Sequence, residues 1–66
     1  MKQSDLKLHK TSTGFIHSGV SKRRGCNIVI YQYKNSEDEW RFSLPMDDLI
    51  FTKLEDIVEH LTIEGY

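Results

Sequence analysis

The sequence predicts an α+β fold: a three-stranded antiparallel meander with one C-terminal helix packed on one face of the sheet. Three observations support this β-β-β-α order. Residues 26–33 are almost entirely β-branched or aromatic, residues 39–44 alternate apolar and polar side chains, and residues 54–61 repeat apolar side chains at helical spacing. A chain of 66 residues is too short for two domains and can bury only a small core.

The N-terminal residues are the least structured part of the predicted fold. Residues 1–13 are polar apart from Leu6 and Leu8, so we expect a weakly ordered segment or an edge strand. Residues 14–66 then form a single small α+β domain.

Three strands are expected in the middle of the chain. The first covers residues 15–20 and is followed by a charged loop at 21–25 that ends in glycine. The second covers residues 26–33, the strongest strand signal in the sequence, and a polar turn at 34–38 leads into the third strand at 39–44.

The C-terminal third is expected to be helical. We expect a short helical turn near 45–50, a break, and the main helix at 53–62. Thr52 and Glu55 have the spacing of a capping box, in which a hydroxyl and a carboxylate satisfy free backbone amides at the helix start. Gly65 suits the end of a helix.

The charges divide unevenly along the chain. Residues 1–34 hold seven basic residues and one acidic residue, a net charge of +6, and residues 35–66 hold two basic and nine acidic residues, a net charge of -7. Such a split indicates a dipolar molecule with a basic surface that suits an anionic partner, unless the two halves neutralise each other on folding.

Cysteine content and hydropathy indicate the compartment. The single cysteine, Cys26, has no partner for an intramolecular disulfide, which favours a reducing environment. No apolar run is long enough for a signal peptide or a membrane span. We therefore expect a cytoplasmic protein without membrane contact.

The sequence contains no recognised catalytic or metal-binding pattern. Cys26 and His17 lie on neighbouring predicted strands, but no third group or oxyanion donor is evident. The histidines and the cysteine lack the paired spacing of a zinc site, and no glycine-rich phosphate loop is present. We expect no enzyme, cofactor or small-molecule substrate.

The predicted sheet has more apolar surface than one helix covers. The core side is expected to carry Trp40, Phe42 and Leu44, together with Ile28 and Ile30. A binding face is expected on the other side, because a strand that is apolar on both faces normally has cover on both. Its predicted residues are Val29, Tyr31, Tyr33 and Arg41.

Three interpretations of this face remain open. The first is self-association as a homodimer, or recognition of a protein partner. The alternative is single-stranded nucleic-acid binding, with stacking on the tyrosines and possible phosphate contacts from Lys22, Arg23, Arg24 and Lys34. In the third, the tyrosines only pack against Leu6 and Leu8 of the same chain.

The region from Asn27 to Leu61 contains a tyrosine-bearing strand, an acidic turn, a strand ending in Ser43-Leu44 and an amphipathic helix. This layout resembles the single-strand-binding domain of transcriptional coactivators of the positive-cofactor-four class. That family has a basic, glycine-containing approach to its last strand, and here residues 37–40 read Glu-Asp-Glu-Trp instead. The resemblance implies the nucleic-acid alternative.

Overall fold

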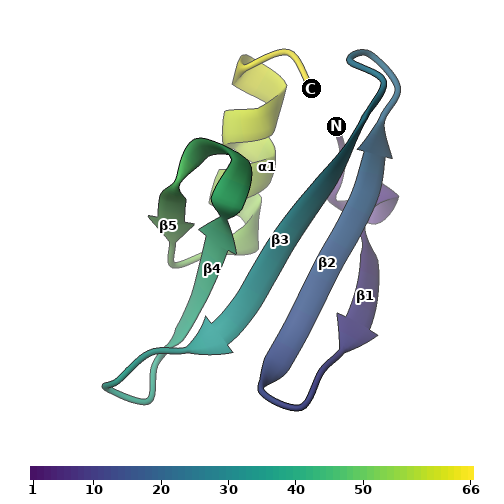
Figure 1. The fold of residues 1–66 in the computed structure, drawn as a ribbon. Coiled ribbons are helices and arrows are strands. Elements are labelled where there is room, and N and C mark those ends of the chain that lie inside the picture. The colour runs from purple at the N-terminus through teal and green to yellow at the C-terminus, as the bar shows by residue number, and fades with distance from the viewer.

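The computed structural model describes residues 1–66 as one antiparallel sheet with a helix packed on it (Figure 1). The sheet has five strands in the order β1-β2-β3-β4-β5, so each strand pairs with its neighbour in sequence. The elements in chain order are η1 (Gln3–Asp5), β1 (Lys7–Lys10), β2 (Gly14–Ser21), β3 (Cys26–Lys34), β4 (Trp40–Leu44), η2 (Pro45–Asp47), β5 (Leu49–Phe51) and α1 (Leu54–Ile63).

The prediction of a three-stranded sheet is wrong, because a short strand is added at each edge. At one edge β1 pairs with β2, so residues 7–10 form the edge strand that was one of the two options for the N-terminal segment. At the other edge β5 pairs with β4. The fold is α+β, but its sheet has five strands.

A tight turn between β4 and β5 explains why the sequence did not predict β5. Pro45 begins the short 3-10 helix η2, and Asp48 then takes a left-handed conformation with φ 53°. Aspartate tolerates this conformation better than most residues. The turn sends the chain back along β4, so Leu49–Phe51 forms a strand where the sequence predicted a continuing helical turn.

The helix α1 lies within one residue of its predicted position, but its cap differs from the prediction. The N-cap residue is Lys53, and it makes no side-chain capping hydrogen bond. The predicted capping box of Thr52 and Glu55 is therefore wrong. No helix in the structure is long and apolar enough to cross a membrane.

The core consists of apolar side chains between α1 and the centre of the sheet. Its fully buried members are Ile28, Ile30, Leu44, Ile57 and Leu61. Burial of each side chain contributes about 1.5–3 kcal/mol to folding. The core side of β3 and β4 is the one that the alternation predicted.

The sheet is longer than the helix that covers it. The 10 residues of α1 span about 15 Å, whereas the 9 residues of β3 span about 30 Å. The ends of β2, β3 and β4 extend past the start of α1 (Figure 1). There Phe15 contacts Trp40 and His17 contacts Phe42, each with ring centroids 5.8 Å apart.

Candidate interaction surface

The sheet face that points away from α1 is called the helix-free face here. Pairing across all five strands places one transverse row of residues on it: His9 beside Ile16, Ile16 beside Tyr31, Tyr31 beside Ser43, and Ser43 beside Ile50. These positions alternate with the buried Ile30 and Leu44 of the core, so their side chains point to the opposite side. The row therefore crosses the whole width of the sheet.

The helix-free face is largely apolar and open to solvent. Tyr31 is 45% exposed, Val20 58% and Ile50 65%. Ile16, Val29 and Tyr33 are half-buried. Five of them form a patch on β2 and β3, and Ile50 lies on β5, beyond the polar Ser43 of β4.

The N-terminal segment does not cover this patch. Leu6 packs against the core on the helix side of the sheet. Leu8 pairs with His17, whose neighbour in β3 is the buried Ile30, so Leu8 also belongs to the helix side. The interpretation in which these leucines pack on the tyrosines is wrong.

A shallow groove lies at one end of the helix-free face. Its volume is about 420 Å³, and its lining includes Lys7, Ser18, Val20, Asn27 and Val29. Asp5 of η1 also lines this groove, so the face is hollowed and carries both charges at this end.

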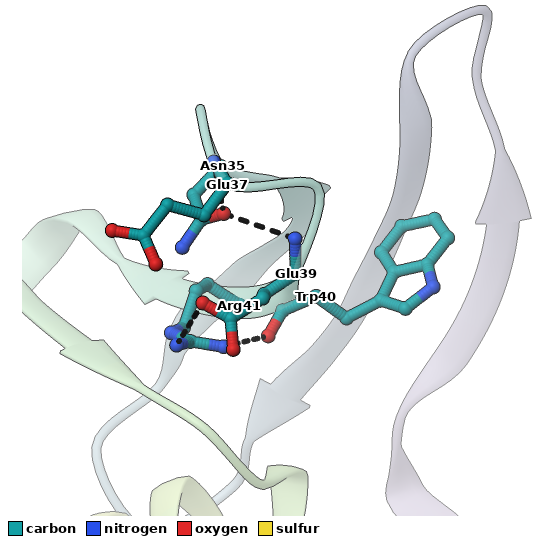
Figure 2. A network of polar contacts seen from close by, with 5 residues as sticks. All are labelled: Asn35, Glu37, Glu39, Trp40 and Arg41. Atoms are coloured by element: carbon teal, nitrogen blue, oxygen red, sulfur yellow. Dashed lines mark hydrogen bonds and ion pairs between the residues drawn. The ribbon is translucent and has the colours of Figure 1, made fainter.

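Arg41 is held in place by the hairpin between β3 and β4 (Figure 2). The side-chain oxygen of Asn35 accepts hydrogen bonds from the backbone amides of Glu37 and Glu39 at 2.9 and 3.0 Å, and this fixes the turn. The guanidinium of Arg41 donates to the carbonyl of Trp40 at 2.7 Å and lies 3.3 Å from the carboxylate of Glu39. Arg41 is thus beside Tyr33 with its charge partly balanced.

The ionisable strand residues of the helix-free face, apart from the tyrosines, are two cations and one histidine. Lys7 and His9 lie on it in β1, and Arg41 lies on it in β4. No aspartate or glutamate occupies a strand position on this face. The acidic residues lie mainly in the turns and on α1.

Three of the four residues predicted as phosphate contacts share the β2–β3 turn, and Lys34 lies at the opposite end of β3. Lys34 pairs with Trp40 on the helix side, where its ammonium lies 3.4 Å from Asp38 and 5.4 Å from the centre of the indole. Arg24 donates to the carbonyl of Glu64 and lies 4.4 Å from the ring centre of Tyr66. Lys22 and Arg23 are exposed in the β2–β3 turn.

The structure does not bring Cys26 and His17 together. Cys26 pairs with Ser21, whereas His17 pairs with Ile30, so about 13 Å of strand separates them. The imidazole of His17 instead lies 2.7 Å from the side-chain oxygen of Gln32. No group of three His, Cys, Asp or Glu side chains has the arrangement of a metal site.

Sequence reasoning identified four residues of the helix-free face and missed its outer part. Val29, Tyr31, Tyr33 and Arg41 lie on the sheet face where the alternation of two predicted strands placed them. Ile16 and Val20 could have been assigned from the alternation in the first predicted strand. His9 lies in the edge strand that was one of the two options for the N-terminal segment, whereas Ile50 could not be assigned because β5 was not predicted.

No protein-family model, no curated protein and no solved structure matches this chain.

Proposed function

We propose that this protein is a non-enzymatic binding module that works by self-association, with the helix-free face as the contact between two copies. The observation that carries the proposal is the apolar patch on β2 and β3, which lies on the sheet face opposite the only α-helix. Contiguous apolar patches of this kind are typical of interaction sites. A second copy also adds buried surface to a core of only five fully buried apolar side chains.

The dimensions of the molecule fit a dimer through this face. Five strands span about 19 Å and β3 is about 30 Å long, so the face measures at most about 600 Å², the lower end of what each partner of a standard interface buries. A stack of two sheets uses most of that area.

Stacking of faces suits the chain better than extension of the sheet through its edge. The edge strand β1 carries Lys7, His9 and Lys10. Two antiparallel copies of β1 would bring these cationic side chains close together, and charged edges of this kind oppose strand addition.

The test is sedimentation of the wild type and of the Tyr31→Ser/Tyr33→Ser variant at micromolar concentration. We expect a dimer for the wild type and at least about tenfold weaker association for the variant, because central tyrosines dominate interface energy. Leu8→Ser is the matched control, since Leu8 is an exposed apolar residue on the helix side of the same sheet. A monomeric wild type, or equal loss in the control, contradicts the proposal.

Single-stranded nucleic-acid binding is the second candidate, and one observation supports it. On the helix-free face Arg41 pairs with Tyr33, and Lys7 and His9 lie two strands away from the tyrosines, in β1. No strand position on this face is acidic. This arrangement provides stacking rings next to groups that neutralise phosphate. Titration with oligonucleotides at increasing salt tests it: binding must fall steeply with salt, and absence of binding at low salt contradicts it.

A further inference from the structure

The order of the strands turns the charge division of the sequence into a gradient across the sheet. Because neighbours in sequence are neighbours in the sheet, residues 1–34 with net charge +6 form β1 to β3. Residues 35–66 with net charge -7 form β4, β5 and α1. The β1 edge therefore carries Lys7, His9 and Lys10. On the other side of the sheet the acidic residues lie in the turns and on α1, and Asp48 directly precedes the uncharged strand β5.

Two copies that stack their helix-free faces with aligned strands have two symmetric arrangements. If the two-fold axis runs perpendicular to the strands, each strand lies over the same strand of the second copy, so that β1 faces β1. With the axis along the strands and through β3, β1 faces β5 of the second copy and β2 faces β4. Only the second arrangement sets the two charge gradients in opposite directions.

The row of residues across the helix-free face makes this arrangement specific. With the axis along β3, Tyr31 meets Tyr31 of the second copy at the centre of the row. His9 then lies opposite Ile50 of the second copy, and Ile16 lies opposite its Ser43.

The next row toward the groove shows where opposite charges meet. Lys7 pairs with Ser18, and Ser18 with Val29. The register between β3 and β4 and between β4 and β5 extends this row from Val29 to the turn from Pro45 to Asp48. Lys7 therefore faces Asp48 of the second copy. The carboxylate of Asp47, in the same turn, lies 2.8 Å from the imidazole of His60 and so points toward α1. In the across-strand arrangement Lys7 faces the lysine-bearing β1 instead.

We infer that the two copies associate around a two-fold axis parallel to β3, with the basic β1 edge of each copy over the β5 edge of the other, so that Lys7 lies opposite Asp48. This inference rests on the proposed self-association and specifies its geometry. Charge complementarity selects this arrangement over the like-charged alternative, in which cationic edges coincide.

Cross-linking of engineered cysteines tests the geometry. His9→Cys and Ile50→Cys are made in separate copies in a Cys26→Ala background, and the copies are mixed with a bis-maleimide whose spacer is about 10 Å, the usual separation of stacked sheets. One of the two copies carries a small mass tag, so that mixed and identical pairs are distinguished by mass spectrometry.

The expected product is a mixed pair that links His9→Cys to Ile50→Cys. His9→Cys alone is not expected to link to itself, because four strand spacings, about 19 Å, separate the two copies of this position. Lys10→Cys is the control on the helix side of β1 and is expected to link to neither variant.

Sedimentation of the same samples separates failure of this inference from failure of the proposed function. A dimer in which His9→Cys links to itself, or in which neither position links, overturns the inferred axis and leaves self-association standing. Monomeric samples overturn both.

Discussion

Gly19 lies where β2 passes under the N-terminal 3-10 helix. A Cβ atom added at this position would lie 2.6 Å from the backbone carbonyl oxygen of Asp5 and 3.3 Å from the side chain of Leu6. The backbone atom cannot move away without displacing η1 from the sheet. The absence of a side chain at this residue is therefore what lets the N-terminal segment pack on the core.

We expect Gly19→Ala to lower the free energy of unfolding by about 1–3 kcal/mol, the usual cost of forced overpacking. Urea denaturation measures the change. Ser18→Ala is the control, because Ser18 is the adjacent residue on the helix-free face and its substitution should change stability by less than about 0.5 kcal/mol. Equal values for the two variants would show that η1 does not hold its place against β2.

At the scale of elements, the start of α1 is the least optimised feature. Lys53 occupies the N-cap with extended backbone angles, φ -135° and ψ 140°, and supplies no capping oxygen. Its cation also lies at the positive end of the helix dipole. Asp56 occupies the N3 position, where its carboxylate is suitably placed for a capping box with a serine at the N-cap.

We expect Lys53→Ser to raise the free energy of unfolding by about 0.5–2 kcal/mol, because serine accepts a hydrogen bond from a free amide of the first turn. Thermal or urea unfolding measures the gain. Thr52→Ala should leave stability almost unchanged, since Thr52 precedes the N-cap. If Thr52→Ala is the more damaging change, the helix begins one residue earlier than described.

The elements differ in how much of their structure their own sequence determines. Residues 26–34 and 40–44 form strands whose side-chain alternation also sets which face each residue occupies, so Val29 and Tyr31 could be placed from sequence. The edge strands β1 and β5 have 4 and 3 residues and owe their conformation to pairing with a neighbour. Because the left-handed turn at Asp48 directs that pairing at β5, the row ending at Ile50 could not be predicted.

At the scale of the whole molecule, self-association should couple stability to concentration. A dimer that dissociates on unfolding gains stability by mass action, and for two chains of this size the Tm should rise by roughly 5 °C per tenfold increase in protein concentration. Scanning calorimetry over a hundredfold range measures the rise. The Tyr31→Ser/Tyr33→Ser variant should have a lower Tm at each concentration and a smaller rise at the low end of the range, because it associates more weakly. A constant Tm for the wild type would indicate a monomer at all these concentrations.

The charge gradient across the sheet gives a prediction about the dimer as a whole. Lys7 and Lys10 both belong to β1, but Lys7 lies on the helix-free face and Lys10 on the helix side. Lys7→Glu should weaken association about 3- to 10-fold at low salt, because it places an anion opposite the acidic turn of the second copy.

Lys10→Glu changes the net charge by the same amount and should leave the dissociation constant within about twofold, since exposed charges remote from the contact contribute little. Sedimentation at about 20 mM and 500 mM salt compares the two variants, and the loss in Lys7→Glu should shrink at high salt because screening shortens the range of the repulsion. Stronger association of Lys7→Glu would instead mean that it relieves repulsion between two like-charged β1 edges. Because net charge is matched, a difference between the variants reports which face of β1 meets the second copy.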